Sequence, residues 1–366
     1  MKFRAERDSL VEALGAAGRA VASRLAMPVL AGLLVSVTNN DLVITGTDGD
    51  LSIRVELEVI GVENGSAVIP AKLANDIARS LEPGAVTIEA TDESVSISAA
   101  RSQFSLRTFP VIEFPQVQIT SERQLSIPSA SIADALRQVV RASSNDDARP
   151  LLTGVLLTTH NGALRLVATD SYRLALRDLD GSAAALGEQD ILVPSRALTE
   201  LQRAITGDED EQVGVTATTS EITFSVGKVS ISTRLISGTY PDYRQLIPES
   251  YPNRLHLGKE TLIGALRRVR LLVKDNTTPV RLSMRQGGVD LKVVSQEVGE
   301  GAESVDGDFT GEDLIIAFNP SYLIDGIEAV KGDEVIIETS DGTRPATIRA
   351  GEADGYRYLL MPVRVS

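Results

Sequence analysis

The sequence predicts an α+β fold in which one unit of about 120 residues occurs three times. Three kinds of segment recur in the same order: a helix that starts with Ser or Thr, two strands joined by a tight turn, and a helix that follows a proline. Alternating segments typical of strands come after each second helix. Two amphipathic helices per unit can cover only one face of a sheet, which is the α+β arrangement.

The first helix of each unit begins with Ser or Thr, an aliphatic residue, two variable residues, Ala and Leu. This pattern occupies residues 9–14, 131–136 and 261–266, at offsets of 122 and 130. In the third copy Leu262, Leu266 and Val269 share one stripe at about 100° per residue, as in an amphipathic helix. The predicted helices span 8–24, 131–142 and 259–274.

A β-hairpin is predicted after each of these helices, because an aliphatic run, a polar pair and a second alternating run follow. The polar pairs tolerate the positive φ of a two-residue hairpin turn. They are Asn39-Asn40, Asn161-Gly162 and Gly287-Gly288.

A proline opens the second helix of each unit, at Pro70, Pro194 and Pro320. Proline suits the first helical position, since its missing N–H would have no partner there. The predicted helices span 72–80, 194–205 and 320–331. Together these patterns predict three domains, at 1–122, 125–250 and 252–366.

Composition limits the classes of function. The 366 residues contain no Cys, which excludes disulfides, thiolate metal sites and a Cys nucleophile. The N-terminus shows no signal-peptide pattern, and no apolar run approaches the roughly 18 residues of a membrane span. We therefore expect a cytoplasmic protein without a membrane partner. A net charge of −14 argues against an outer surface that coats DNA or anionic lipid.

Basic residues are concentrated on the six predicted helices. These segments carry 14 basic and 8 acidic residues, a net charge of +6, so the rest of the chain carries −20. One interpretation is that a polyanion lies against the helix side and is bound through its backbone without regard to sequence. The alternative is a repeat scaffold that binds only protein segments, with its helix arginines merely solvated.

No pattern in the sequence indicates catalysis. His160 and His256 are the only histidines and have no metal-ligand spacing. The stretch around Gly258 lacks the glycine of a phosphate-binding loop, and no nucleophile elbow occurs. We therefore expect no enzyme, no metal and no cofactor. An enzyme whose two carboxylates meet only in space remains a third hypothesis.

Several motifs carry a family resemblance from one end of the chain to the other. They are MPVLAGLLVSV (27–37), ITGTD (44–48), VIPAKL (68–73), FSLRTFP (104–110), EFPQV (113–117), ATDSYRLAL (168–176), GTYPDYRQLIP (238–248), FNPSYL (318–323) and LLMPVRV (359–365). In combination they resemble the beta subunit of bacterial DNA polymerase III, the family of sliding clamps. The resemblance implies a head-to-tail homodimer that closes a ring of six domains, with helices lining the hole and duplex DNA passing through it. The implied partners are the replicative polymerase, the clamp loader and other proteins with a clamp-binding motif.

The resemblance also implies residues for DNA contact. Positions matching those where clamps touch DNA are Arg24, Lys72, Arg149, Pro150 and Leu151. To these the basic stripes of the predicted helices add Arg137, Arg141, Arg196, Arg203, Arg267 and Arg270. Asp146 stands where the family usually has a neutral polar residue, which puts that contact in doubt.

A groove for partner peptides is implied between the second and third units. Its residues would be Leu152, Thr169, Ser171, Tyr172, Arg173, Leu174, Pro241, Leu246, Asn319, Tyr322, Thr343, Pro345, Leu360, Met361, Pro362, Val363 and Arg364. Gln245, Ser171-Tyr172 and the added Ser366 are modest departures from the family pattern. For the dimer, the resemblance implies that Phe104 and Leu106 face Leu271 and Leu272 of the second subunit.

Overall fold

The computed structural model describes residues 1–21, 27–117, 125–181, 190–208, 210–248, 250–274, 278–351 and 355–364. The chain forms two compact units, Met1–Ile132 with Arg196–Leu235, and Ala133–Ser195 with Ile236–Ser366. The second predicted repeat contributes to both units, because its strands pair with strands of the repeats before and after it.

The first unit contains α1 (Arg7–Gly18), α2 (Ala71–Ser80) and α4 (Ser195–Ala204) with two antiparallel sheets. The five-stranded sheet has the order β5-β1-β7-β8-β9, with strands Ile60–Glu63, Lys2–Glu6, Ala85–Ala90, Ser94–Ala99 and Ser102–Arg107. The eight-stranded sheet has the order β10-β15-β16-β17-β4-β3-β2-β6, with strands Leu125–Pro128, Gln212–Ala217, Glu221–Val226, Val229–Arg234, Leu51–Glu58, Asp41–Thr47, Gly32–Thr38 and Gly65–Pro70. The first and second repeats meet where β4 pairs with β17.

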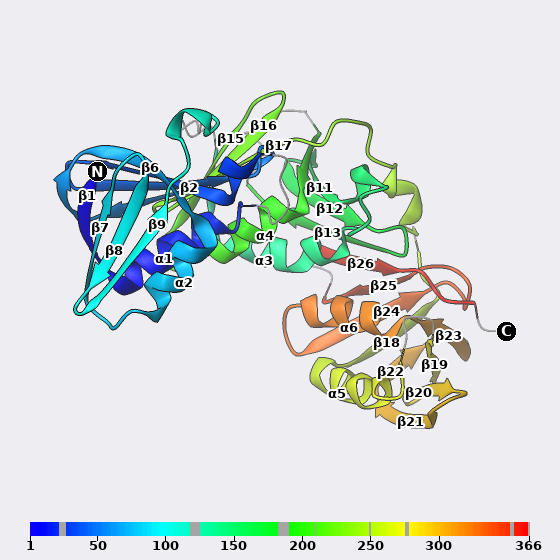
Figure 1. Ribbon diagram of the computed structural model, residues 1–366. Coiled ribbons are helices and arrows are strands. Elements are labelled where there is room, and N and C mark those ends of the chain that lie inside the picture. Colours follow the sequence, from blue (N-terminus) through cyan, green and yellow to red (C-terminus); the bar gives the residue numbers. More distant parts are fainter. Residues whose placement is uncertain are drawn as a thin grey trace. The chain divides into compact units, whose positions relative to one another are not determined.

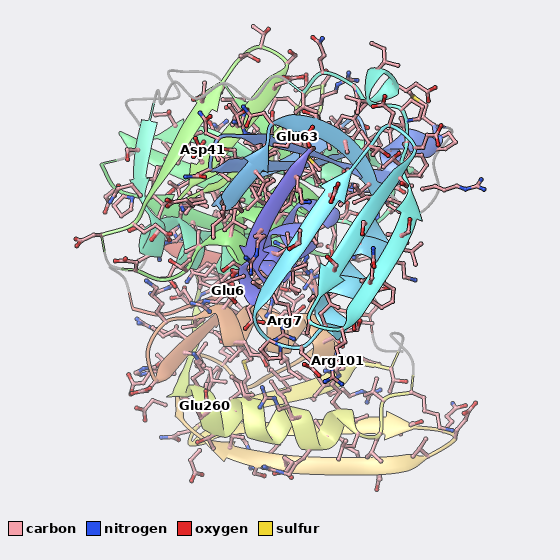
Figure 2. The ribbon with its side chains drawn as sticks, turned by 60° about the vertical axis from the view of Figure 1, so that its left-hand side comes forward. Glu6, Arg7, Asp41, Glu63, Arg101 and Glu260 are labelled. Atoms are coloured by element: carbon pink, nitrogen blue, oxygen red, sulfur yellow. The ribbon has the colours of Figure 1, made fainter. Side chains whose placement is uncertain are left out.

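The helix α1 follows β1 directly, and Figure 2 shows Glu6 and Arg7 at this junction. It lies beside α2 and packs on β3 and β4 (Figure 1). Leu10 on its apolar face is completely buried. Gly46 on β3 permits the close approach of the helix, because a Cβ there would lie 2.1 Å from the carbonyl oxygen of Ala17.

The second unit contains α5 (Lys259–Arg270), α6 (Pro320–Ala329) and most of α3 (Ser129–Val139). Its nine-stranded sheet has the order β14-β11-β12-β13-β26-β25-β24-β18-β22, with strands Ile191–Pro194, Gly154–His160, Ala163–Thr169, Arg173–Leu179, Tyr356–Leu360, Ala346–Arg349, Glu334–Thr339, Asn253–Gly258 and Asp308–Thr310. The four-stranded sheet has the order β21-β20-β19-β23, with strands Gly299–Asp306, Gly288–Ser295, Val280–Arg285 and Leu314–Phe318.

The helices α5 and α6 lie side by side in this unit (Figure 1). Contacts from α5 reach β20 and β21, and contacts from α6 reach β25 and β26. The predicted apolar stripe of α5 is buried, with Leu262 and Leu266 fully inaccessible. On α6, Gly326 lets Tyr358 pack against the helix, because a Cβ would come within 2.4 Å of the tyrosine ring.

The predicted hairpins are present in all three repeats. Asn39 and Asn161 have positive φ, at 55° and 50°, in turns that join β2 to β3 and β11 to β12. The third turn lies one residue earlier than predicted, because Gly288 already pairs with Arg285 as the first residue of β20.

The predicted helix boundaries need several corrections. The first helix, predicted over 8–24, ends at Gly18, and residues 22–24 lie outside the described ranges. Proline occupies the first helical turn only at Pro320, whereas Pro70 precedes α2 and Pro194 ends β14. A φ near −60° suits an extended residue as well as a helical one. Proline therefore marks the strand–helix junction but does not determine whether it ends the strand or begins the helix. The prediction of a helix to residue 274 was also wrong, because α5 ends at Arg270. After it, the N–H of Val273 donates to Arg270 O at 2.9 Å in a tighter turn.

Within the described ranges, no helix has both the length and the apolar character needed to cross a membrane.

Candidate functional site

The basic residues of the helices, which we call the helix cations, are mostly exposed. They are Lys72 and Arg79 on α2, Arg137 on α3, Arg141 just after it, Arg196 and Arg203 on α4, and Arg267 and Arg270 on α5. Arg24 lies outside the described residues. Among the described residues, Lys72, Arg79 and Arg270 have no acidic side chain within ion-pair distance. These three cations are therefore the most available to a polyanion.

A single carboxylate holds two helix cations of the second unit. Glu328 on α6 accepts from Arg267 Nη2 at 2.8 Å and from Arg141 Nη1 at 3.3 Å. The same end of α6 accepts a hydrogen bond from a side chain, since Gln138 Nε2 donates to the main-chain oxygen of Ala329 at 3.0 Å. Donors and cations at a helix C-terminus satisfy carbonyls that lack a partner within the helix. Arg141 and Arg267 therefore face a partly neutralised surface.

Three cations of the first unit, Arg19, Arg196 and Arg203, are also paired. The carboxylate of Glu200, which is buried on α4, accepts from Arg203 Nη1 at 2.6 Å and from Arg19 Nε. Arg196 pairs with Asp48 at the end of β3. The arginines of these pairs are partly exposed, but the carboxylates of Glu200 and Asp48 are only 6% and 11% exposed. A phosphate that drew an arginine away would leave a nearly buried charge without its partner, so this exchange costs more than it does for an exposed ion pair.

Arg149 lies next to the turn that precedes β13. Its Nε donates to Asp146 at 2.9 Å, and Nη1 donates to the carbonyl of Asp170 at 3.3 Å. The pKa of Asp146 is lowered by hydrogen bonds from the N–H of Ala148 and from Arg149. The acid at this position therefore orients Arg149 within its own loop.

The two apolar neighbours of Arg149 differ in exposure. Pro150 is exposed, and Leu151 is half-buried against an apolar cluster of the same unit. A Cβ on Gly238 would lie 2.6 Å from Leu151, so the leucine is held by packing.

The residues of the predicted groove all belong to the second unit, and we call them the peptide surface. A tight turn between β12 and β13 forms its centre. Thr169 Oγ1 donates to Arg173 O at 2.7 Å and accepts from the N–H of Ser171 at 3.1 Å. Ser171 has φ of 80°, and the Asp170 carboxylate accepts from the N–H of Tyr172 at 2.9 Å. This turn leaves the Tyr172 side chain 60% exposed.

The last strand of the chain completes the surface. β26 pairs antiparallel with β13, so Leu174 lies opposite Leu359 and Arg173 opposite Leu360. The N–H of Met361 then donates to Tyr172 O at 2.9 Å. The apolar C-terminal stretch noted in the sequence is therefore held by strand pairing.

An apolar cluster of the second unit lies close in the chain to exposed apolar side chains. The buried members are Leu156, Val167, Leu174, Leu176, Leu192, Tyr240, Tyr243 and Leu359, and Leu151, Ile236 and Ile247 pack against them. Leu246, next to Ile247, is 47% exposed, and Met361 and Val363, shortly after Leu359, are 41% and 37% exposed. Exposed apolar side chains near such a cluster are typical of a protein-binding site.

Arg173 links this surface to α6. Its guanidinium lies over the ring of Tyr322 at 4.2 Å and donates to Asp170 at 3.0 Å and Asp325 at 2.6 Å. Burial alone would lower the pKa of Arg173, but the hydroxyl of Tyr358 and the two carboxylates raise it above its usual value. Arg173 is thus a fixed cation that positions Tyr322.

Several further groove residues have structural roles. Asn319 caps α6 by accepting from the N–H groups of Ser321 at 2.9 Å and Tyr322 at 3.2 Å. Thr343 donates to Asp341, which lowers the pKa of that carboxyl. The other positions differ mainly in exposure. Leu152 and Leu360 are buried, Pro345 and Pro362 are half-buried, and Pro241 and Arg364 are exposed.

The structure therefore gathers the predicted groove residues on one unit, but sequence reasoning missed three groups that organise them. Asp325 and Tyr358 hold Arg173, and Tyr243 fills the apolar cluster. Only Tyr243 had a signal in the sequence, since it lies within the motif 238–248. The other two act through contacts between residues more than 150 positions apart.

The predicted dimer residues lie at sheet edges. β9 is the edge strand of the five-stranded sheet, where Phe104 is 38% exposed and Leu106 is half-buried. β21 is the edge of the four-stranded sheet, and Leu272 packs against it at Gly301. Leu271 beside it is 83% exposed. Both units thus carry an unpaired edge strand next to exposed apolar side chains.

No group of three or more His, Asp or Glu residues able to hold a metal occurs in the part of the chain that the structure describes. His160 ends β11 and His256 lies on β18, where its Nε2 is 2.9 Å from Glu334.

Comparison with known proteins gives one consistent result. Models of the N-terminal, central and C-terminal domains of the DNA polymerase III beta subunit match residues 1–118, 126–242 and 244–364. The chain is 33% identical to the beta sliding clamp of Streptomyces coelicolor and 30% identical to that of Bacillus subtilis, with all of both chains covered.

Solved structures agree with this result. The DNA polymerase sliding clamp of Bacillus subtilis superposes with a TM-score of 0.92 at 29% identity. The DnaN sliding clamp of Bartonella birtlesii, solved with bound griselimycin, gives 0.93 at 29% identity. Both alignments cover the whole of each chain.

Proposed function

The chain belongs to the DNA polymerase III beta subunit family, the bacterial beta sliding clamps, and we propose which of its residues face DNA, which bind partner proteins and which join two subunits. As a sliding clamp it encircles duplex DNA and tethers the replicative polymerase, which confers processivity, and it catalyses no reaction of its own. Because bacteria replicate their chromosome in the cytoplasm, we infer that compartment for this chain.

We propose that the helix cations line the DNA-facing side of the ring. The observation that carries this proposal is the charge of the predicted helical segments, +6 in a chain of net charge −14. Within the helix bounds of the structure, 10 basic and 8 acidic residues remain, a net charge of +2, and Arg19, Arg141 and Lys274 lie just beyond helix ends. Lys72 on α2 and Arg270 on α5 are exposed without an acidic partner among the described residues. Arg149 and Pro150 form a second candidate contact near the β12–β13 turn. The acidic remainder of the chain would repel DNA from the outside of the ring.

The pairing of many helix cations suits a ring that slides. Arg267 and Arg141 share Glu328, and Arg203 shares Glu200 with Arg19. Each phosphate contact then replaces an existing ion pair, so the net gain per contact is small. Contacts of this kind are insensitive to base sequence and weaken with salt. Topological closure of the ring, rather than affinity, keeps it on DNA.

We propose that the ring closes by edge-to-edge pairing of β9 from one subunit with β21 of the other. The exposed Phe104 and Leu106 would pack against Leu271 and Leu272 across this seam. The two surfaces differ, so the contact is heterologous, and a ring results when the rotation between subunits closes. Continuous strand pairing would cover both unpaired edges.

We propose that the peptide surface binds short apolar segments of the polymerase, the clamp loader and other partners. Leu174, Leu246 and Met361 provide the apolar contacts, and the turn at Ser171 presents Tyr172 at the rim. We also propose three domains, at 1–122, 125–250 and 252–366. The family matches at 1–118, 126–242 and 244–364 support a division into three, with the second boundary about eight residues earlier than in this proposal.

Retention on DNA tests the ring. After loading by a clamp loader, the protein should remain on nicked circular duplex and leave when the circle is linearised, because linear DNA offers an exit. Equal retention on both forms would show that affinity rather than topology holds the protein.

A charged substitution tests the peptide surface. Leu174→Asp places a carboxylate in the apolar cluster, and Met361→Asp does so at its exposed edge. Both should abolish binding of the polymerase while the protein remains a dimer. Simultaneous loss of binding and dimerisation in both variants would mean that these residues only stabilise the fold.

A further inference from the structure

The turn at the centre of the peptide surface has an equivalent in the first unit. Between β3 and β4, Thr47 Oγ1 donates to Leu51 O at 3.1 Å and accepts from the N–H of Gly49 at 3.1 Å. The Asp48 carboxylate accepts from the N–H of Asp50 at 3.0 Å, and Gly49 has φ of 98°. These are the bonds that Thr169 and Asp170 make in the second unit, so each residue of one turn corresponds to one residue of the other.

Strand pairing extends the correspondence. In the first unit Ser52 lies opposite Ser232, where the second unit has Leu174 opposite Leu359. The N–H of Arg234 donates to Asp50 O at 3.0 Å, as the N–H of Met361 donates to Tyr172 O at 2.9 Å. Arg234 is therefore the counterpart of Met361.

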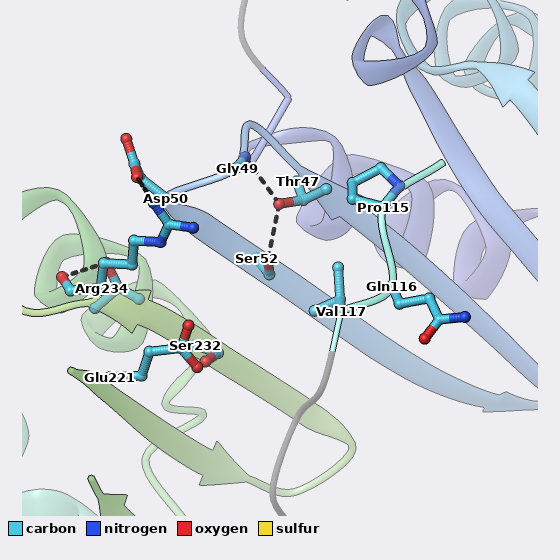
Figure 3. A pocket seen from close by; sticks show the side chains of 11 residues that line it. Thr47, Gly49, Asp50, Ser52, Pro115, Gln116, Val117, Glu221, Ser232 and Arg234 are labelled. Atoms are coloured by element: carbon cyan, nitrogen blue, oxygen red, sulfur yellow. Dashed lines mark hydrogen bonds and ion pairs between the residues drawn. The ribbon is translucent and has the colours of Figure 1, made fainter. Parts of the chain in front are cut away.

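A pocket of about 370 Å³ lies at this position in the first unit (Figure 3). Its lining residues include Thr47, Asp50, Ser52, Ser232, Thr233 and Arg234. By the correspondence, these residues occupy the positions of Thr169, Tyr172, Leu174, Leu359, Leu360 and Met361. The pocket is thus a second copy of the peptide site, made from the first and second repeats.

The chemistry of the two copies differs at the positions that matter for an apolar peptide. Serine replaces leucine at Ser52 and Ser232, and an ion pair of Arg234 with Asp50, at 3.6 Å, replaces Met361 and Tyr172. The hydroxyls of the floor already bond to neighbours: Thr47 Oγ1 to Ser52 Oγ at 2.7 Å, and Thr223 Oγ1 to Ser232 Oγ at 3.1 Å. Figure 3 shows the bond between Thr47 and Ser52 at the pocket floor.

An apolar side chain of a peptide placed on this floor would gain little binding free energy. It would remove water from the hydroxyls and from the Arg234–Asp50 pair, and Pro115 and Val117 would be its main apolar contacts in return. The same backbone with leucine at the two serine positions would offer the contacts present in the second unit.

We propose that this pocket is a copy of the peptide site that the chain keeps closed to apolar peptides, and that Ser52, Ser232 and Arg234 are the residues that close it. The inference rests on the proposed function of the peptide surface. It predicts that one subunit binds a single apolar peptide although its repeated architecture provides two equivalent positions.

Peptide stoichiometry tests the proposal. The probe is a short fluorescein-labelled peptide with two leucines and one phenylalanine, and binding is measured by titration calorimetry on the full-length protein. We expect one peptide per chain for the wild type and none for Leu174→Asp. The triple variant Ser52→Leu, Ser232→Leu, Arg234→Met should bind two, and the same variant with Leu174→Asp should bind one.

The outcomes separate this proposal from the function on which it rests. If wild-type binding survives Leu174→Asp at one site per chain, the proposed peptide surface is wrong. If the wild type binds two peptides, or if the folded triple variant binds only one and loses it with Leu174→Asp, the pocket proposal is wrong. If the two leucines unfold the sheet, a milder variant, Ser52→Val, Ser232→Val, Arg234→Met, replaces the triple variant, and circular dichroism checks that it is folded. The number of peptides bound per chain then tests the proposal in the same way.

Discussion

Arg173 donates from Nη1 to Oδ2 of Asp325 at 2.6 Å, which joins the turn before β13 to the helix α6. Asp325 also lies 3.9 Å from Nη1 of Arg141. One carboxylate is therefore shared between a residue of the peptide surface and a helix cation. The two proposed binding sites of the second unit are in electrostatic contact.

Asp325→Asn should weaken peptide binding. Arg173 would keep Asp170 but lose its second carboxylate, so its guanidinium would hold Tyr322 less firmly. Asp325 is 32% exposed, so we expect a loss of only about 1 kcal/mol, roughly fivefold in Kd. Titration with a clamp-binding peptide measures it.

Asp290→Asn is the matched control for this change. Asp290 pairs with Arg285 at 2.6 Å across β19 and β20, away from the peptide surface. Equal Kd values for the two variants would mean that Asp325 does not position the groove.

Glu328→Gln should strengthen the hold on DNA. The substitution removes the carboxylate that neutralises both Arg141 and Arg267, so the helix face gains one positive charge. We expect the loaded clamp to diffuse more slowly on DNA and to tolerate more salt before contacts are lost. Single-molecule tracking measures the diffusion coefficient, and an unchanged value would argue against DNA contact by this pair. Asp290→Asn is again the control, because it removes the same charge from a strand rather than from a helix and should leave the diffusion coefficient unchanged.

Arg270→Glu should reduce loading and polymerase processivity, because Arg270 is exposed and has no acidic partner among the described residues. We expect a decrease of roughly tenfold at physiological salt and a salt dependence about one unit shallower. Arg285→Glu makes the same charge reversal on β19 and should behave like the wild type. If the two variants lose processivity equally, net charge rather than helix position is responsible.

Phe104→Asp should convert the dimer to a monomer, since a carboxylate at the β9 edge would be buried without a partner in the seam. Light scattering at low micromolar concentration measures the mass. Ile112→Asp is the control, because Ile112 is 94% exposed but lies outside the edge strand. A Phe104→Asp protein that stays dimeric would move the interface elsewhere.

The link between α5 and β21 should weaken in acid. Arg268 donates to both oxygens of Glu303 at 2.8 Å, and these hydrogen bonds lower the pKa of Glu303 below 4.5. The ionised Glu303 carboxylate stabilises the folded state through its pair with Arg268. This contribution is fully present above the pKa of Glu303 in the unfolded chain, and it is lost as the pH falls through the lower pKa of the folded state. Titration of the Glu303 side chain by NMR measures this pKa, and a value at or above 4.5 would contradict the pairing. Arg268→Gln should raise it.

Local patterns in the sequence were sufficient for the elements of each repeat. Asn39 and Asn161 identified hairpin turns because their side chains tolerate positive φ, and the Ser/Thr-started helices were found near their true positions. Helix ends were less predictable. The apolar stripe continues past Arg270, but the backbone changes to a tighter turn there, and composition alone does not report that change.

Charge pairing could not be predicted in the same way. The sequence showed an excess of cations on the predicted helices. In the structure Glu200 pairs with Arg203 on its own helix, and Glu328 on α6 pairs with Arg267 on α5 and with Arg141 just after α3. Glu200 is nearly buried, and its partner Arg19 is 181 residues away in the chain. Such a pair depends on how the helices pack, which no local pattern encodes.

The peptide surface is an intermediate case. The family motifs identified its members, and the structure explains how distant stretches meet: β26 pairs with β13 although the partners Arg173 and Leu360 are 187 positions apart. The repeat of this arrangement in the first unit was invisible to motif comparison, because Ser52 and Leu174 are chemically unlike and only the hydrogen bonds of their turns match.

The pairing of β4 with β17 determines how the protein behaves when its repeats are separated or cleaved from each other. Residues of the first repeat, such as Ile53, lie opposite residues of the second, such as Ile231, within one continuous sheet. A repeat expressed on its own would expose an unpaired edge strand, so isolated repeats should aggregate and be poorly soluble. A protease nick between the repeats should instead leave two fragments that migrate together until denaturant is added.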